Sequence, residues 1–201
     1  MPIYIPPHFQ TSDRSLAEDV MRRFEFATVV TAGEGGPWIT HVPLVLDAGG
    51  DVLRGHVARA NGQTGSLEGG RASAVFHGPH AYVSPTWYDE DPAVPTWNYI
   101  VVHATGPTRH LGRDEAAAHL DEVFARYEGT GVASLPADWF DSKLRGIVAF
   151  ELQIETLECK AKMSQNKSWE DRKRVVERLR ERGQGDDSAV AEFVAALGEG
   201  Q

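Results

Sequence analysis

The sequence is short of cysteine and of long apolar runs. It contains one cysteine, Cys159, so no internal disulfide is possible, which is compatible with a reducing cytoplasm. Apolar runs such as 100–102 and 147–150 are far shorter than the roughly 20 residues that a membrane-spanning helix needs. The N-terminus lacks a basic segment followed by an apolar one, so no signal peptide is expected. These absences predict a cytoplasmic protein without a membrane segment.

Basic residues are also few. The chain has 20 Lys and Arg against 29 Asp and Glu, and a net charge of −9. A protein that binds nucleic acid usually carries an excess of Lys and Arg on its contact face, because it must neutralise phosphates. The acidic balance therefore argues against direct DNA binding, unless the basic residues of the C-terminal region form a separate patch.

Several catalytic and nucleotide-binding motifs are missing. The chain has no G-x-x-x-x-G-K-[ST], no strand-linked G-x-G-x-x-G, no H-E-x-x-H and no C-x-x-C. Because C-x-x-C-H is absent as well, any haem must be bound non-covalently. No obvious base lies beside Cys159, so we interpret this residue as a small buried hydrophobic side chain.

What the sequence does contain is a series of strand patterns. Its 201 residues fit one domain, or one domain with a helical annex. Segments rich in Val, Ile, Thr and aromatic residues predict strands at 26–32, 38–47, 52–60, 72–82, 99–111 and 147–157. The glycine-rich connections between the first of these strands supply the positive φ that hairpin turns need. Successive hairpins predict antiparallel pairing, and therefore a barrel or a sandwich.

Helical patterns lie mainly outside this region. Helices are expected at 12–24, 114–127, 169–182 and 189–197, with a short one around residues 139–144. The last two full helices are interpreted as solvated helices that pack on the β scaffold through one thin apolar stripe.

An aromatic loop, 84–98, joins two predicted strands. It and the strand ends beside it carry Trp87, Tyr88, Trp97 and Tyr99. Aromatic side chains each bury a large area, and their N–H or O–H groups then need partners, so this composition does not suit a simple linker. The loop is either one wall of a binding site or an aromatic plug that closes one end of a barrel.

Among the histidines, His56 is the first candidate for chemistry. It lies near the end of a predicted strand between Gly55 and Val57, and a glycine allows another group to approach the backbone closely. A neutral imidazole there could be the axial ligand of a haem iron. The alternative is a histidine that is hydrogen-bonded within the barrel. Tyr82, Trp97 and Tyr99 could line a planar cofactor, although barrel core is also a good explanation for each of them.

Basic residues gather near these positions. They are Arg59, Lys160, Lys162, Lys167 and Arg172. A flavin phosphate and the two propionates of a haem both need cationic partners, so the group predicts an anionic cofactor without identifying it. The alternative, a solvated helix face, applies best to Arg172 and the residues after it.

Long motifs resemble the PaiB family, also called FMN-binding negative transcriptional regulators. The similar stretches cover nearly the whole chain in order: 4–9, 55–61, 78–85 with 87–88, 94–99 and 162–167. The resemblance implies the FMN-binding split β-barrel, an antiparallel, mainly β fold with flanking helices (α+β). It also implies a homodimer with cofactor sites at the subunit interface. On this basis residues 1–165 are expected to form the cofactor-binding barrel with inserted helices, and 166–201 a helical extension packed on it.

The resemblance also implies which residues bind the cofactor. It implies cofactor binding by residues of the shared motifs and their neighbours: His56, Arg59, Asn61, Trp97, Lys162, Ser164, Gln165 and Asn166. Proteins similar to PaiB include haem-dependent piperazate synthases, which close N5-hydroxyornithine into a ring by forming an N–N bond. In that branch His56 would hold the iron of a haem b.

One departure from the family pattern favours haem. After Asn61 the regulators generally continue Pro-Gln-Trp, whereas this chain has Gly62-Gln63-Thr64. Loss of a Trp predicts a roomier pocket, and a porphyrin is bulkier than an isoalloxazine ring.

Three hypotheses follow. The first is an enzyme with haem b on His56, a small amino-acid substrate, and a general base among His80, Tyr82 and Lys162. The second is an FMN-binding negative transcriptional regulator or flavin-dependent oxidoreductase. The third is a cofactor-free dimeric binding module. An absorption spectrum distinguishes them.

Overall fold

The chain forms two compact units in a computed structural model that describes residues 3–9, 13–89 and 92–198. Unit 1 comprises Met1–Val20, His77–Val102 and Glu158–Gln201, and unit 2 comprises Met21–Phe76 and His103–Leu157. Strands β5 (Arg71–Val83) and β6 (Thr96–His110) contribute residues to both units. The division into 1–165 and 166–201 has other boundaries and stays a prediction.

The described strands confirm a mainly β, antiparallel architecture with flanking helices. The remaining strands are β1 (Phe26–Thr31), β2 (Trp38–Pro43), β3 (Val45–Leu46), β4 (Val52–Ala58), β7 (Ile147–Gln153) and β8 (Thr156–Lys162). Their order in one eight-stranded sheet is β2-β1-β5-β6-β7-β4-β3, and β8 pairs with β6. The pairs β1–β2, β1–β5, β3–β4, β4–β7 and β6–β7 are antiparallel.

Two strand predictions need correction. The segment 38–47 is broken at Leu44, whose N–H donates to the Glu25 carbonyl at 2.9 Å, and Pro43 has no N–H to continue the ladder. The predicted strand at 147–157 ends at Gln153. There the chain turns, because the N–H groups of Ile154 and Glu155 donate to carbonyls of other segments. Strand β8 follows this turn and was not predicted.

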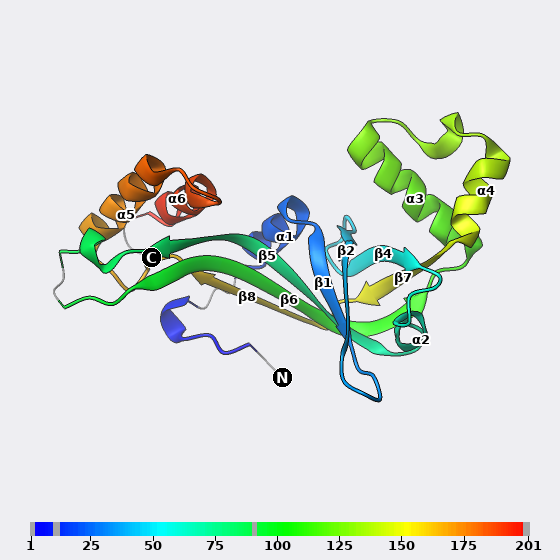
Figure 1. The fold of residues 1–201 in the computed structure, drawn as a ribbon, viewed down its shortest axis with the longest axis horizontal. Helices are drawn as coiled ribbons and strands as arrows, with labels where there is room; N and C mark the ends of the chain where they lie inside the picture. The colour runs from blue at the N-terminus through cyan, green and yellow to red at the C-terminus, as the bar shows by residue number, and fades with distance from the viewer. Residues whose placement is uncertain (1–2, 10–12, 90–91, 199–201) are drawn as a thin grey trace. The chain divides into compact units, whose positions relative to one another are not determined.

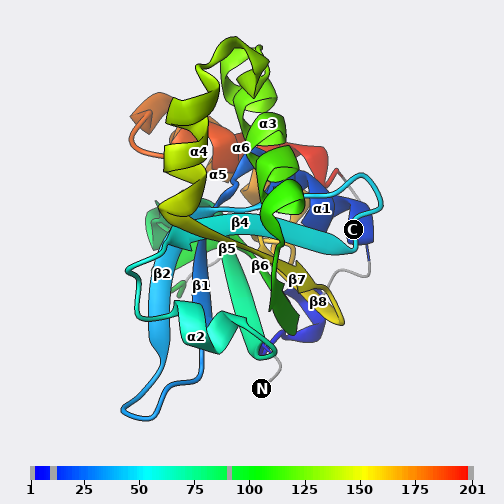
Figure 2. The same ribbon diagram turned by 90° about the vertical axis from the view of Figure 1, so that its right-hand side faces the viewer.

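In unit 2, two helices cover one side of the β4–β7 pair. These are α3 (Arg113–Glu128) and α4 (Ala137–Arg145), which lie side by side next to the two strands in Figures 1 and 2. Both match the helices predicted there. A small apolar core forms where they meet the sheet, made of Ala116, Leu120, Leu144 and Ala149. The core fixes the face of α3 that looks onto β4 and β7. A short helix, α2 (Thr64–Leu67), follows β4.

In unit 1, helices α5 (Trp169–Arg182) and α6 (Asp187–Ala196) pack on each other, as Figure 1 shows in orange and red. Their shared core is a stripe of buried aliphatic side chains: Val175, Val176, Leu179, Val190, Ala191 and Val194. Arg172 is also buried, at 2% exposure, and donates to the Val194 carbonyl at 3.4 Å. Its interpretation as part of a solvated face was therefore wrong.

The rest of unit 1 includes α1 (Arg14–Arg23), whose last residues belong to unit 2, and the short 3-10 helices η1 (Pro7–Phe9) and η2 (Pro85–Trp87). Ser12, the first residue of the helix predicted at 12–24, lies outside the described residues. A third 3-10 helix, η3 (Val132–Ser134), joins α3 to α4 in unit 2. Over the described ranges, no helix combines the length and apolarity that crossing a membrane requires.

Candidate functional site

His56 lies on β4 directly opposite Ala149 of β7, and its imidazole meets a second imidazole. His56 Nδ1 is 3.3 Å from Nε2 of His119, which α3 supplies. The two ring centroids are 5.5 Å apart and the ring planes meet at 64°. His56 is half-buried and His119 is 2% exposed. The structure thus pairs the expected histidine with one that sequence reasoning missed.

Burial keeps both imidazoles neutral at pH 7. It lowers the pKa of His56, and it lowers the pKa of His119 to about 4, helped by the positive charge that His56 can carry and by Arg54. Neutral imidazole is the form that binds iron. Among the described residues His56 Nε2 makes no hydrogen bond, so this nitrogen is not committed to a protein partner.

Gly55 has a different role from the one expected. A Cβ built at Gly55 would lie 2.5 Å from Leu44 Cδ2 and 3.1 Å from the Pro43 carbonyl oxygen. The groups that approach Gly55 closely therefore belong to the protein itself, namely the Leu44 side chain and the Pro43 carbonyl. Glycine at this position allows β4 to pack against the β2–β3 corner and so places His56, but it leaves no room for a ligand on that side.

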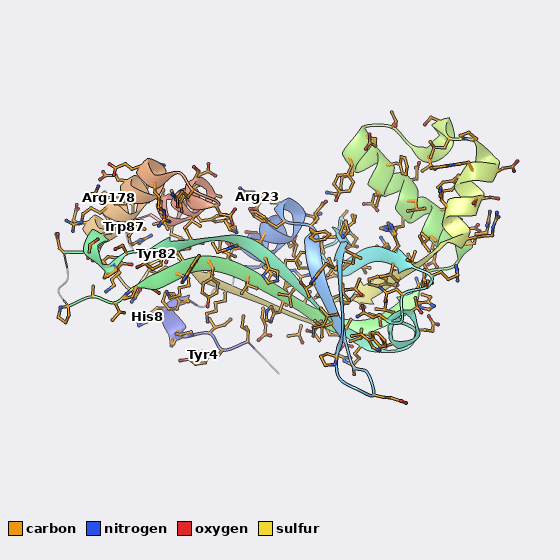
Figure 3. All side chains as sticks on the ribbon, viewed as in Figure 1. Tyr4, His8, Arg23, Tyr82, Trp87 and Arg178 are labelled. Carbon is orange, nitrogen blue, oxygen red and sulfur yellow. The ribbon has the colours of Figure 1, made fainter. Side chains whose placement is uncertain are left out.

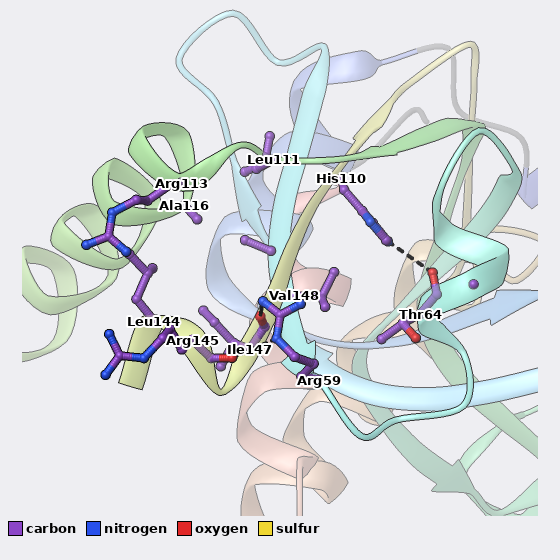
Figure 4. A pocket seen from close by; sticks show the side chains of 12 residues that line it. Arg59, Thr64, His110, Leu111, Arg113, Ala116, Leu144, Arg145, Ile147 and Val148 are labelled. Carbon is purple, nitrogen blue, oxygen red and sulfur yellow. Dashed lines mark hydrogen bonds between the residues drawn. The ribbon is translucent and has the colours of Figure 1, made fainter. Parts of the chain in front are cut away.

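A cavity of about 410 Å³ opens in unit 2 (Figure 4), and its lining includes Ala149, the cross-strand neighbour of His56. Its lining residues come from the end of β4, α2, β6, α3, α4 and β7: Arg59, Thr64, Gly65, His110, Leu111, Arg113, Ala116, Leu144, Arg145, Ile147, Val148 and Ala149. His56 is not among them, but its cross-strand neighbour Ala149 is. The volume falls in the range of roughly 300–1,000 Å³ that is usual for small-molecule sites.

The polar side chains that line the cavity are basic or neutral. Arg59, Arg113, Arg145 and His110 surround an aliphatic floor, and no carboxylate belongs to the lining. His110 Nε2 lies 3.0 Å from the Thr64 carbonyl oxygen, the dashed contact in Figure 4. An aliphatic floor with a cationic rim suits a flat apolar molecule that carries acidic groups.

Arg59 has a second, structural function. Its Nε donates to the Arg145 carbonyl and its Nη2 to the Ile147 carbonyl, both at 2.6 Å, and its backbone N–H donates to the Gly146 carbonyl at 2.9 Å. Arg59 therefore closes the C-terminal end of α4 at the edge of the cavity. This arrangement is consistent with its predicted cofactor role and fixes its position.

The side chain of Asn61 stabilises the turn after β4 through two hydrogen bonds. Its Nδ2 donates to Thr40 Oγ1 at 3.1 Å, and its Oδ1 accepts the Gln63 N–H at 2.9 Å. Gln63 is fully buried and donates to the Val29 carbonyl. Asn61 does not line the cavity, whereas Thr64, where the family pattern has Trp, does. The smaller side chain at this position, Thr64, therefore forms part of the cavity wall.

In unit 1, three predicted site residues form an exposed ring cluster. The ring of Trp97 lies 6.1 Å from that of His80 and 6.1 Å from that of Tyr82. Trp97 is 53% and Tyr82 37% exposed, which contradicts the alternative that these two residues belong to the barrel core. Figure 3 shows Tyr82 on β5, near Trp87. His80 Nδ1 lies 3.3 Å from Asp186 Oδ2, a geometry that orients the imidazole.

The aromatic loop, 84–98, matches neither of the two predicted alternatives completely, because some of its residues are buried and others are exposed. Tyr88 is buried at 9% exposure, whereas Val94 is 75% exposed. Asn98 is fully buried and its Nδ2 donates to Ser164 Oγ at 3.0 Å. Among its described residues the loop is therefore anchored by Tyr88 and Asn98, and its other residues are partly or fully exposed.

The motif at 162–166 is a tightly held turn of unit 1. Ser164 is 4% exposed and has a φ of 61°, unusual for a residue other than glycine. Gln165 fixes the turn: its Oε1 accepts the Met163 N–H and its Nε2 donates to the Ala161 carbonyl, both at 2.6 Å. Asn166 is exposed. The cofactor roles of Ser164, Gln165 and Asn166 stay predictions.

Lys162, at the start of this motif, has a partly buried ammonium group. Its Nζ donates to the Trp97 carbonyl at 2.8 Å and to Thr96 Oγ1. Burial, together with the charge of Lys160, lowers the pKa of Lys162. Such a lysine is easier to deprotonate than a surface lysine.

The predicted site residues thus fall into two groups. His56, Arg59 and Asn61 belong to unit 2, and the other seven belong to unit 1: His80, Tyr82, Trp97, Lys162, Ser164, Gln165 and Asn166. Cys159 is 6% exposed, and burial raises the pKa of its thiol to about 11, with a smaller contribution from Asp13. Its interpretation as a small buried side chain is confirmed.

Comparison with solved structures defines the class of fold. The FAD and haem binding protein of Mycobacterium smegmatis superposes with a TM-score of 0.58 at 17% identity, over 76% of this chain and 73% of that one. The flavocytochrome Anf3 of Azotobacter vinelandii superposes with a TM-score of 0.57 at 13% identity, over 79% and 72%. The chain therefore has the antiparallel split-barrel fold found among flavin-binding proteins, as predicted.

Sequence comparison identifies the family. Residues 3–156 match the family model described as "Putative FMN-binding domain". The protein named "Protease synthase and sporulation protein PAI 2" of Bacillus subtilis (strain 168) is 33% identical over 202 residues, which cover 96% of each chain. The chain belongs to the PaiB family, as its motifs predicted.

Proposed function

We propose that this chain binds haem b through His56 and is an enzyme of the piperazate synthase type, which forms an N–N bond within N5-hydroxyornithine. The observation that carries the proposal is the His56–His119 pair, in which Nδ1 of a neutral His56 lies 3.3 Å from its partner and Nε2 makes no hydrogen bond to a described residue. Histidines that bind metals usually have their second nitrogen held in this way.

The donor set beside His56 fits the cofactor. Haem b needs a neutral axial imidazole, an apolar surface for the porphyrin and cations for two propionates. The cavity lined by Ala149 offers an aliphatic floor, Arg59 and Arg145 supply positive charge, and Arg113 is ion-paired with Asp141 at 2.5 Å. Thr64 leaves space that the Trp of the family pattern would fill. Both solved proteins compared above bind haem or are flavocytochromes by their printed names, which supports the proposal.

When bound, the iron would supply a Lewis acid for the hydroxylamine oxygen of the substrate. The chain must then remove one proton from the attacking amine. As the N–N bond forms, the N–O bond breaks, and the hydroxide that leaves combines with this proton to give water, so no outside oxidant or reductant is consumed. Proton removal requires a base with a pKa near the working pH.

Two of the three predicted bases have suitable surroundings. Lys162 has a lowered pKa, although its Nζ already donates to the Trp97 carbonyl. His80 is oriented by Asp186, the arrangement that holds many catalytic imidazoles in place. Tyr82 offers a partly exposed phenol. We propose Lys162 or His80 as the base. We also propose a homodimer that acts on an amino acid and does not bind DNA.

FMN is the second candidate cofactor. The description of the matched family names FMN, and a cationic rim would also bind a flavin phosphate. In that case the chain would be an FMN-binding negative transcriptional regulator or a flavin-dependent oxidoreductase. The net charge of −9 argues against the DNA-binding form.

Titration of the purified apo-protein with haem b, followed by absorption spectroscopy, tests the proposal. We expect a Soret band at one haem per chain that His56→Ala abolishes. His41→Ala is the matched control, because His41 is an exposed imidazole on β2 of the same unit that bonds to Thr28 Oγ1. Haem binding by His56→Ala at unchanged affinity would refute the ligand assignment. Failure to convert N5-hydroxyornithine would refute only the reaction.

A further inference from the structure

We infer that His119 is a positioning residue for His56: it fixes the tautomer and the ring orientation in which His56 can bind iron. The inference rests on the proposed haem ligation by His56. It starts from the 3.3 Å contact between His56 Nδ1 and His119 Nε2, and from the burial of His119, which is 2% exposed on α3.

The contact between the two nitrogens restricts where the protons lie. A hydrogen bond between the two facing nitrogens requires that one of them donates and the other accepts. If His56 Nδ1–H donates, His56 Nε2 keeps a lone pair that can bind iron. If His119 Nε2–H donates instead, the proton of His56 lies on Nε2 and blocks this lone pair. His119 as an acceptor therefore selects the ligating tautomer.

The other ring nitrogen of His119, Nδ1, does not favour either tautomer through a hydrogen bond. This atom is buried and has no hydrogen-bond partner among the described residues. It is unpartnered whether it carries the proton or not, so neither tautomer gains a hydrogen bond at this end. A cation at His56 Nε2 would then decide the arrangement, with His119 accepting from His56.

The helix holds His119 rigidly enough for this role. Ala116 and Leu120, three residues before and one after, are buried on the same face of α3 against Leu144 and Ala149. The first turn of α3 is closed by Glu115, which accepts the Gly112 N–H at 2.8 Å. Both ends of the contact thus belong to packed elements, α3 and the β4–β7 pair. His119 was not among the residues that the sequence singled out.

Haem binding and redox titration of three variants test this role, because each variant replaces the group at position 119 that accepts the His56 Nδ1–H. His119→Leu removes the acceptor, His119→Gln offers a neutral carbonyl oxygen, and His119→Glu offers a carboxylate. Loss of a partner that orients a metal ligand typically weakens binding by about 10- to 100-fold. We expect haem affinity to fall by this factor in His119→Leu, with a shifted Soret band, and to recover in His119→Gln.

The midpoint potential of the haem separates positioning from packing. An anionic acceptor makes the axial imidazole more basic and stabilises the ferric state, so His119→Glu should have a lower potential than the wild type, and His119→Leu a higher one. Glu122→Leu, an exposed change on α3, is the control and should leave both affinity and potential unchanged. Thermal unfolding of each apo-variant reports any purely structural effect.

The outcomes are distinct. If the wild type binds haem and His119→Leu shows the same affinity, spectrum and potential, the role of His119 is refuted while haem ligation by His56 stands. If the wild type shows no Soret band, the proposed function fails and the role of His119 fails with it.

Discussion

The ion pair between Asp187 and Arg182 gives a quantitative prediction for unit 1. Asp187 is 2% exposed, and Arg182 donates to it through Nε at 2.7 Å and Nη2 at 2.5 Å. Arg182 Nη2 also donates to the Tyr82 carbonyl at 2.9 Å, so the pair ties the α5–α6 turn to the strand that carries His80 and Tyr82. Asp187→Asn keeps the shape of the side chain but leaves the guanidinium without its carboxylate.

The magnitude follows from the burial of the two side chains. Removing one partner of a buried ion pair costs about 3–5 kcal/mol, and because the Arg182 side chain is 24% exposed, water offsets part of this cost. We therefore expect a loss of about 3 kcal/mol in the free energy of unfolding. With an ordinary urea m-value this lowers the denaturation midpoint by about 1 to 2 M. The matched control is Glu192→Gln, which removes the same charge from an exposed position of α6.

The pH dependence gives a second check on this pair. Arg182, followed by the Gln184 N–H, holds the pKa of Asp187 below its usual 3.8 against the opposing effect of burial. A carboxyl whose pKa is lowered by folding stabilises the protein above the unfolded pKa, and this stability is lost as the pH falls through the folded pKa. The difference between wild type and Asp187→Asn should therefore be constant from pH 7 to 5 and shrink below pH 3.8. A urea midpoint for Asp187→Asn within 0.3 M (roughly 0.6 kcal/mol) of that for Glu192→Gln at pH 7 would show that the ion pair contributes little to stability.

Three further predictions concern packing, reactivity and the cavity. Gly106→Ala would place a Cβ 1.7 Å from the Gln153 carbonyl oxygen, so urea denaturation should show a loss of at least about 1–3 kcal/mol, whereas Gly35→Ala, with nothing within 4 Å, should unfold like the wild type. The pKa of Cys159 is raised from 9.0 to about 11, so the native protein should contain about 100-fold less thiolate at pH 7.5 than the unfolded protein. A thiol reagent should therefore label Cys159 in unfolded protein but barely in native protein. Rapid labelling of native protein would contradict the burial of this residue. Thr64→Trp should fill the cavity wall and weaken haem binding at least about 10-fold in the spectroscopic titration, and unchanged affinity would place the haem elsewhere.

The β scaffold could be predicted because its signals are local. Alternating apolar residues and glycine-rich turns define β1, β2, β4 and their hairpins, and positive φ at Gly36 and Gly50 is what such turns require. β8 could not be predicted in the same way. Its buried positions, Cys159 and Ala161, alternate with Glu and Lys, and its pairing with β6 depends on residues far away in the sequence. The division into two units also depends on long-range contacts.

The candidate site was only partly predictable. His56 could be singled out because the glycine beside it in a strand allows another group to approach the backbone closely, whereas His119 lies in a helix of mixed polarity without such a neighbour. The available signal was its spacing: Ala116, His119 and Leu120 occupy positions i, i+3 and i+4, which share one face of a helix. The exposure of Trp97 carried no such signal, because aromatic residues in strands are more often buried.

Competition between haem b and FMN for the apo-protein decides which cofactor the chain binds. Apo-protein is equilibrated with equal concentrations of haem b and FMN, passed through a desalting column and measured by absorption, in parallel with His56→Ala. We expect the wild type to retain haem with a Soret band and no flavin absorption, and His56→Ala to retain no haem. A wild-type protein that emerges yellow, with flavin absorption and no Soret band, would contradict haem binding by this chain.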